Sequence, residues 1–364
     1  MKKIIVSILI LPSLYGCTGI RLQSKDSAVI AARTLEFGAN VIQTNIIFVP
    51  RATAYVGTTP LKNTAGHKWQ SKYAFIGINF FNYPHVMDGL NEKGLNVGLF
   101  YFPDYAKYPT FDKQNAANTL APWELGTWIV SNFSSVNEVL QNIRNITIAP
   151  TIASELGFSP PVHYIVHDAA GNSLVIEYIN GICFTHQNKL GVFTNAPSFD
   201  WHTTNLKNYI NLSAFNVQAF DLSGIHMTGF GQGTGFLGIP GDFTPPSRFV
   251  RATAFVQSSV PADTALNAVK SAFHILNSFD IPKGSVRELI NKKTSYEVTQ
   301  FTSACDLKNL ILYFHTYENR QIQCVTLNKF NVNGKEIALV TMHEPEKIVD
   351  ISNQTHIFNA PITK

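Results

Sequence analysis

The chain of 364 residues is poor in charge, since Lys, Arg, Asp and Glu together make up only 14% of it. It contains no long basic run, so it lacks the electrostatic signature of a nucleic-acid-binding protein. Hydrophobic residues make up 45% of the chain, which indicates a substantial folded core and argues against disorder. The length allows one large or two ordinary domains, and no linker or shift in composition divides the chain.

Cysteine is also scarce, with residues only at positions 17, 183, 305 and 324. A disulfide framework is not expected in a chain of this size with so few cysteines, although a single bridge is compatible with them. Neither a CxxC pair nor an HExxH stretch occurs, so we predict no metal site. Residues 233–238 fit GxGxxG, but no clear strand precedes them and Ile-Pro-Gly follows, so we predict no cofactor.

The longest apolar run lies at the start of the chain. Lys2 and Lys3 precede the apolar residues 4–14, so residues 1–16 have the form of a secretory signal peptide, too short to span a bilayer comfortably. No later segment is apolar enough to cross a membrane. We therefore expect an exported protein, periplasmic or extracellular, in which residues 17–364 form a single domain.

Three outcomes are open at the end of this leader. Leu14-Tyr15-Gly16-Cys17 resembles the box that marks bacterial lipoproteins, in which case Cys17 is acylated and anchored to a membrane. Cleavage between Gly16 and Cys17 instead produces a free N-terminal cysteine. Cleavage a few residues upstream, followed by self-removal of the remnant, leads to the same cysteine.

A free N-terminal Cys17 would carry a thiol and an α-amino group on one residue. A thiol titrates near ~8.5 and an α-amino group near ~7.7–8.0, so both are usable near neutral pH. The thiolate is the reactive form, and a terminal amine can act as its base. Cys17 is therefore the candidate nucleophile.

Hydrophobic patterns predict strands and helices in alternating groups. Around Cys17, residues 19–23 and 28–33 are predicted to form two strands joined by a turn at 25–27. Further strands are expected at 43–50, 72–80, 162–167, 173–179, 295–305, 310–316 and 321–327, and helices at 123–133, 200–212, 263–279 and after a capping box at 135–138. The Thr- and Gly-rich segment 51–70 is predicted to be a loop. Helices that cluster between sets of antiparallel strands predict an α+β sandwich of two sheets between two helix layers.

Several short sequence blocks, taken in order, resemble one known family. They are residues 17–19 (Cys-Thr-Gly), 33–37 (Arg-Thr-Leu-Glu-Phe), 91–103 (ending Tyr-Phe-Pro), 191–202 (with Thr-Asn-Ala-Pro-Ser-Phe-Asp) and 246–251 (Pro-Ser-Arg-Phe-Val-Arg). In this order and at this spacing they resemble the choloylglycine hydrolase family of N-terminal-nucleophile amidases, which includes bile salt hydrolases and penicillin V acylases. The resemblance extends from Cys17 to about Leu327.

The resemblance implies a four-layer αββα sandwich and the hydrolysis of a linear amide without a cofactor. In this family Cys17 would attack the amide carbonyl, form a thioester acyl-enzyme, and use its own α-amine as the base. Asn195 and the backbone of Tyr101 would hold the oxyanion. Arg33 would favour the Cys17 thiolate by its charge, and Arg248 would add positive potential.

Two positions depart from the usual family pattern. Tyr101 stands where many members have Asn, although several penicillin V acylases carry Tyr there. Glu36 stands where the family usually has Asp, so the N-terminal amine is expected to be held differently. Structural interpretations are also open: Tyr101 as a core aromatic, Asn195 as an Asx-turn before a helix, and Arg251 as a helix-face residue.

The resemblance leaves the substrate open and adds a partner. Conjugated bile salts, penicillin V and acyl-homoserine lactones all join an apolar acyl arm to a small polar amine, and a homotetramer is implied as the assembly. The competing hypothesis is a lipid-anchored, inactive binding protein with an acylated Cys17, which leaves Arg33, Asn195 and Arg248 unexplained. A papain-like protease is weaker, because none of the eleven histidines stands in a recognisable block.

Overall fold

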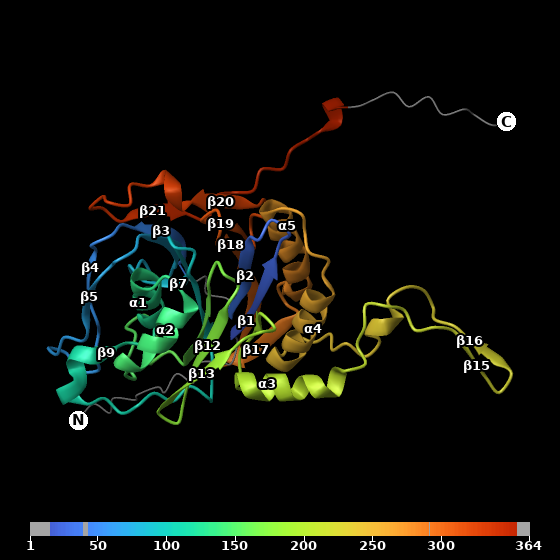
Figure 1. Cartoon of the computed structure of the whole chain (residues 1–364), viewed down its shortest axis with the longest axis horizontal. Coiled ribbons are helices and arrows are strands. Elements are labelled where there is room, and N and C mark those ends of the chain that lie inside the picture. Colours follow the sequence, from blue (N-terminus) through green and yellow to red (C-terminus); the bar gives the residue numbers. More distant parts are fainter. Residues whose placement is uncertain (1–14, 39–42, 291, 355–364) are drawn as a thin grey trace.

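The computed structural model describes residues 15–38, 43–290 and 292–354, so most of the predicted signal peptide lies outside the described residues. Two antiparallel β-sheets form the centre of the molecule (Figure 1). The first sheet has the strand order β14-β1-β2-β18-β19-β20, with β17 paired to β18. Its strands are β14 (Val192–Phe193), β1 (Tyr15–Gln23), β2 (Val29–Gly38), β18 (Lys293–Asp306), β19 (Ile311–Thr316), β20 (Gln323–Thr326) and β17 (Val286–Ile290).

The second sheet is formed mainly by the middle of the chain and has the order β13-β12-β11-β8-β7-β6-β3-β21. Its strands are β13 (Ile182–Gln187), β12 (Ser173–Ile179), β11 (Val162–His167), β8 (Asn96–Tyr101), β7 (Val86–Asn91), β6 (Phe75–Asn79), β3 (Asn45–Val49) and β21 (Ala338–Thr341). The predicted strands that these elements contain are confirmed, with ends that differ by a few residues.

Helices cover the outer face of each sheet. On the first sheet, α4 (Pro245–Ser258) packs on β1 and β14, and α5 (Ala265–Leu276) packs on β2 and β18. On the second sheet, α1 (Leu125–Asn132) packs on β7 and β8, and α2 (Val136–Asn142) packs on β12. The four layers lie side by side in Figure 1, so the predicted αββα sandwich is confirmed.

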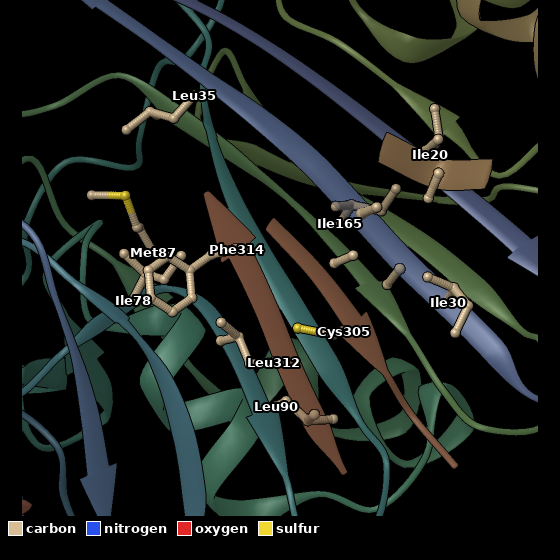
Figure 2. Close-up of a cluster of buried hydrophobic side chains, with 14 of the residues drawn as sticks. Ile20, Ile30, Leu35, Ile78, Met87, Leu90, Ile165, Cys305, Leu312 and Phe314 are labelled. Atoms are coloured by element: carbon tan, nitrogen blue, oxygen red, sulfur yellow. The ribbon is translucent and has the colours of Figure 1, made fainter. Parts of the chain in front are cut away.

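Apolar side chains fill the space between these layers in two clusters. The larger cluster joins residues of both sheets, and Figure 2 shows Ile20, Ile30 and Cys305 of the first sheet together with Ile78 and Ile165 of the second. The smaller cluster lies between the second sheet and helices α1 and α2. Because both faces of each sheet are covered, the strands at the centre are buried along most of their length.

Two of the sequence predictions were wrong. Segment 51–70, predicted as a loop, contains the strands β4 (Ala54–Val56) and β5 (Lys68–Gln70). They form because Tyr55 and Trp69 stack at 4.9 Å between ring centroids and bury one face of this short ribbon. The helix predicted at 200–212 is only α3 (Phe199–Asn205), followed by a 3₁₀ turn (Leu206–Tyr209), since Thr203, Thr204 and Asn205 are weak helix formers.

Beyond this sandwich, a hairpin of β15 (Phe220–Leu222) and β16 (Ile225–Met227) extends away from the body (Figure 1). Its apolar side chains are exposed. The remaining short strands, β9 (Thr119–Leu120) and β10 (Thr147–Ile148), pair with each other. None of the helices in the described part of the chain combines the length and apolar character that a membrane span requires.

Candidate active site

Cys17 lies in β1, in the middle of the sandwich, and is only 2% exposed. Its sulfur accepts a hydrogen bond from Arg33 Nη2 at 2.8 Å. Its backbone N–H donates to Asn195 Oδ1, also at 2.8 Å. Gly16 precedes Cys17 in this structure, so this nitrogen belongs to a peptide bond. Arg33 and Asn195, both predicted from the sequence as site residues, therefore contact the sulfur and the nitrogen of Cys17, which are the two atoms expected to react.

Arg33 is held rigidly beneath the sulfur. It lies on β2 directly opposite Gly19, and its Nη1 donates to the Leu99 carbonyl at 2.6 Å. Its guanidinium carbon stands 4.1 Å from the centroid of the Phe100 ring. A side chain at Gly19 would approach that ring to 2.8 Å, so only glycine leaves room for the support on which Arg33 rests. The orientation of Arg33 toward the sulfur is thus fixed by both sheets.

Asn195 joins the ends of three segments that are distant in sequence. Besides accepting from Cys17, its Oδ1 accepts from Arg248 Nη2 at 2.6 Å, and its Nδ2 donates to the Tyr101 carbonyl at 2.8 Å. An amide has two N–H donors, and within the described residues Nδ2 makes only this one hydrogen bond, so its second N–H is available to a ligand. Because these partners are remote, the alternative interpretation of Asn195 as a local Asx-turn is wrong.

Tyr101 ends β8 and is half-buried, and its backbone hydrogen-bonds to the Cys17 sulfur. Its side chain lines the cavity described below instead of filling the core. The interpretation of Tyr101 as a core aromatic is therefore wrong.

Arg248 lies in the first turn of α4, the helix that packs on β1. The side chain is buried, and it donates to the Cys17 carbonyl, to Thr18 Oγ1 at 2.8 Å and to Asn195. Arg251, interpreted from the sequence as a helix-face residue, lies one turn later on α4, is also buried and donates to the Pro240 carbonyl at 2.6 Å. Arg248 therefore supplies positive charge at the site, while Arg251 fixes the segment that leads into α4.

Glu36 is fully buried near Cys17 but makes its hydrogen bonds elsewhere. Its Oε1 accepts from Thr299 Oγ1 at 3.3 Å. Sequence reasoning missed a second buried carboxylate, Glu297 of β18, which accepts a hydrogen bond from the Gly16 backbone N–H. Burial raises the pKa of Glu297 to about 7, with a further contribution from the charge of Glu36.

The electrostatics at the sulfur combine opposing effects. Burial raises the pKa of the Cys17 thiol above its ordinary value, and the charge of Glu36 adds to this. Arg33 and Arg248 act in the opposite direction and lower the Cys17 pKa. In this chain, with Gly16 attached, burial outweighs the charges of the two arginines, so the Cys17 pKa is raised overall.

An apolar cavity opens beside Cys17, with an empty volume of about 770 Å³ including its open mouth. Aromatic side chains make up much of its wall: Phe37, Phe80, Phe81, Tyr101, Trp123 and Phe158. Met87, Leu99 and Leu156 add aliphatic surface. A cavity of this size and character suits an apolar group whose carbonyl is brought to the sulfur.

Two buried histidines hydrogen-bond to the backbone carbonyls of residues 194 and 195, and neither was identified from the sequence. His163 Nε2 lies 3.0 Å from the Thr194 carbonyl, and its Nδ1 lies 3.2 Å from Glu177 Oε1. His202 Nε2 lies 2.9 Å from the Asn195 carbonyl. Burial lowers the pKa of both rings, that of His202 to about 4. These contacts fix the backbone of residues 194 and 195.

Within the described residues, no group of three or more His, Cys, Asp and Glu side chains could hold a metal ion. The four cysteines are all free, so the single bridge that the sequence allows is not formed in this structure. The groups gathered at this site are a thiol, two guanidinium groups and an amide.

Comparison with known proteins agrees with this geometry. Residues 17–340 match the family described as "Linear amide C-N hydrolases, choloylglycine hydrolase family". The chain belongs to the choloylglycine hydrolase family. As a member of that family it is a hydrolase of linear amide C–N bonds.

Relatives of known name match this chain over most of its length. It is 36% identical over 323 residues to the "Bile salt hydrolase/transferase" of Clostridium perfringens, which spans 88% of this chain and 95% of that protein. It is 24% identical over 328 residues to the "Penicillin V acylase" of Pectobacterium atrosepticum, spanning 83% and 78%.

Solved structures show the same relationship. A mutant conjugated bile acid hydrolase from Clostridium perfringens superposes with a TM-score of 0.81 at 33% identity, covering 92% of this chain and all of the other. A penicillin V acylase from Agrobacterium tumefaciens has a TM-score of 0.72 at 20% identity, covering 89% and 90%, which supports the fold alone.

Proposed function

We propose that Cys17 is the nucleophile of this amide hydrolase and acts as the first residue of the processed chain. The observation that carries the proposal is the position of its sulfur: it contacts Arg33 Nη2 at 2.8 Å and also lines the apolar cavity. A nucleophile in the wall of an apolar cavity, beside a fixed cation, suits acyl transfer to an apolar substrate.

In the first step, the Cys17 sulfur attacks the carbonyl carbon of the bound amide, and its proton passes to the Cys17 α-amine. The carbonyl oxygen becomes an oxyanion, which the second N–H of Asn195 and the Tyr101 backbone would stabilise. The α-ammonium then protonates the leaving nitrogen. The C–N bond breaks, the amine departs and a thioester remains.

In the second step, water attacks the thioester carbonyl and gives a proton to the α-amine. The same oxyanion donors act again, and the C–S bond breaks. The sulfur recovers its proton from the ammonium, and the carboxylic acid leaves. The cycle needs no cofactor, since every proton moves between Cys17, substrate and water.

We propose that the substrate is an amide of the conjugated bile salt or penicillin V type. The cavity wall beside Cys17 is almost entirely apolar, which suits the acyl arm of either molecule. Relatives named for both reactions match this chain, and the bile salt hydrolases match with higher identity. Initial rates on taurocholate, glycocholate and phenoxymethylpenicillin would rank the two classes.

We further propose that residues 1–16 are removed on export to the periplasm or the exterior. The competing hypothesis, a lipid-anchored protein with an acylated Cys17, meets a steric difficulty. Because Cys17 is 2% exposed and its sulfur contacts Arg33, a diacylglyceryl group on this sulfur would have to displace that contact and reach the surface from a buried position.

The test of this function is Cys17→Ser, with Cys324→Ser as a control that alters an exposed thiol far from the site. We expect Cys17→Ser to fold with an unchanged circular dichroism spectrum and to lose nearly all amide hydrolysis, because a hydroxyl is far less ionised than a thiol. Cys324→Ser should retain wild-type turnover. Comparable turnover by folded Cys17→Ser would refute a thiolate mechanism.

A further inference from the structure

Two buried carboxylates flank Gly16, the residue directly before the proposed nucleophile. Gly16 pairs with Glu36 across β1 and β2, and its backbone N–H donates to Glu297 of β18. A Cβ atom on Gly16 would lie 3.1 Å from Glu297 Oε1 and 3.3 Å from Glu36 Oε2. Both distances are shorter than ordinary van der Waals contact, so oxygens of both carboxylates point at this glycine.

One of these carboxylates lacks a partner for an oxygen that faces Gly16. Glu36 is fully buried, and its Oε1 accepts from Thr299, but its Oε2 has no hydrogen-bond partner among the described residues. A buried carboxylate oxygen without a donor is costly, and such atoms are rare in folded proteins. The position of Oε2 beside Gly16 therefore marks a place for a donor group.

We infer that Glu297 and Glu36 together receive the α-ammonium group of Cys17 once Gly16 has been cleaved away, with Glu297 as a positioning residue for the catalytic base. This inference rests on the proposed function, because it requires a chain that begins at Cys17. Cleavage removes the Gly16 N–H, from which Glu297 accepts a hydrogen bond, and turns the Cys17 nitrogen into an ammonium group with three N–H donors. One donor stays on Asn195 Oδ1, and the other two face the carboxylates.

The charges around Cys17 are arranged to favour this state. When the thiol proton moves to the α-amine, it leaves a negative sulfur and a positive nitrogen. Arg33 stabilises the sulfur, and the two carboxylates stabilise the ammonium. Arg248 of α4 also faces the group, and it holds Asn195 Oδ1 as the third acceptor. The ammonium later gives its proton to the leaving amine. The two carboxylates therefore neither supply nor consume a proton in the cycle.

Strand pairing brings the two carboxylates together at Gly16. Gly16 faces Glu36 in the strand register, while Glu297 faces Gly38 of the same strand. Two carboxylates from neighbouring strands thereby reach one point at the start of the mature chain. The amine is held by a pair of residues from β2 and β18, in addition to Asn195.

The α-amine pKa can be measured without thiol or turnover in a Cys17→Ala background. Expression with Met directly before residue 17 lets methionine aminopeptidase leave the substituted alanine as the first residue. Trace labelling with acetic anhydride across pH, read by peptide mass spectrometry, gives the pKa of its amine. We expect Glu297→Gln to lower that pKa by about one unit, the usual effect of removing a nearby opposite charge.

The control is Glu318→Gln, which removes the same charge from an exposed position and should leave the amine pKa unchanged. Glu36→Gln provides a second variant with the same expected decrease. In the enzyme with Cys17 intact, Glu297→Gln should move the rising limb of the kcat/KM profile to lower pH by the same amount, and Glu297→Asp should restore part of the shift.

An amine pKa in Glu297→Gln equal to that of the background protein would overturn the inference, whether or not Glu36→Gln lowers it. Failure of the proposed function has a different signature: an active wild-type enzyme whose mass shows residues before Cys17 or a lipid on its sulfur. The two results are distinguishable because the labelling experiment involves no substrate hydrolysis.

Discussion

Arg33 lies two register positions beyond Cys17 on the neighbouring strand, and its Nη2 donates a 2.8 Å hydrogen bond to the Cys17 sulfur. The guanidinium is itself fixed by the Leu99 carbonyl and the Phe100 ring. Its charge therefore acts on the thiol at a constant distance. This relationship connects the β1–β2 hairpin to the chemistry, since the register of the pair determines whether the two side chains meet.

Replacing Arg33 with Met should raise the pKa of the Cys17 thiol, because the nearby positive charge now lowers it. The thiolate fraction at neutral pH should decrease, and kcat/KM should decrease by about tenfold for each unit of pKa shift. The rate of Cys17 alkylation by iodoacetamide against pH measures the shift directly. Arg287→Met, an exposed arginine on β17, is the control. An unchanged alkylation profile would show that Arg33 has only a structural role.

Replacing Asn195 with Ala should lower kcat by about 10²–10³, the usual effect of losing an oxyanion donor. The residue also hydrogen-bonds to the Cys17 nitrogen and to the Tyr101 carbonyl, so the substitution should lower the free energy of unfolding as well. Steady-state kinetics on the preferred amide test this. Asn208→Ala, an exposed position after α3, should leave kcat unchanged. An effect confined to KM would assign Asn195 to substrate binding.

His202 should make the free energy of unfolding depend on pH. Burial lowers its pKa to about 4 in the folded chain, below the ordinary 6.5. Its contribution is therefore fully present above pH 6.5 and is lost as the pH falls toward 4, because the unfolded chain takes up the proton more readily. Between pH 7.5 and pH 5 this amounts to about 2 kcal/mol.

Urea unfolding at several pH values should show a steeper slope in the wild type than in His202→Gln, because burial also lowers the pKa of His85, His167 and His315 and their contribution is common to both proteins. Loss of the hydrogen bond to the Asn195 carbonyl would lower the free energy of unfolding at every pH, whereas loss of the titrating ring changes its slope with pH. His226→Gln, which changes an exposed ring of the protruding hairpin, should leave the slope unchanged. Identical slopes in His202→Gln and the wild type would contradict the assignment.

The homotetramer implied by the family resemblance stays a prediction, and the β15–β16 hairpin offers a way to test it. Leu222 is 55% exposed and Ile225 is 63% exposed, on an element that extends from the body. If the hairpin packs against another copy of the chain, Leu222→Lys with Ile225→Lys should shift the assembly toward smaller species in sedimentation velocity. A wild type that sediments as a monomer at micromolar concentration would rule out the assembly.

Much of the site could be predicted because its residues stand in local sequence blocks. Cys17, Arg33, Asn195 and Arg248 each lie in a short segment with a recognisable order, and the structure brings all four together. The alternating and β-branched segments likewise predicted most strands of both sheets. Strands with a periodic hydrophobic pattern and site residues within a short sequence block could therefore be predicted from the sequence.

The residues that were missed act through long-range pairing. Glu297 reaches Gly16 only because β18 pairs with β2, which lies far from it in the sequence, and nothing near Glu297 marks it. His163 and Glu177 meet because β11 and β12 are paired, and each looks like an ordinary strand residue. The ribbon of β4 and β5 was missed since its strands have only three residues each.

The central claim is that the active enzyme begins at Cys17, and intact-mass analysis of the active fraction tests it most directly. The base is the α-amine, which a preceding residue would convert into a peptide nitrogen that cannot accept a proton. We predict a mass that corresponds to residues 17–364 with a free amine and a free thiol, and no activity in a chain that keeps one non-removable extra residue. Active protein that retains Gly16, or that carries a diacylglycerol on Cys17, would contradict the account.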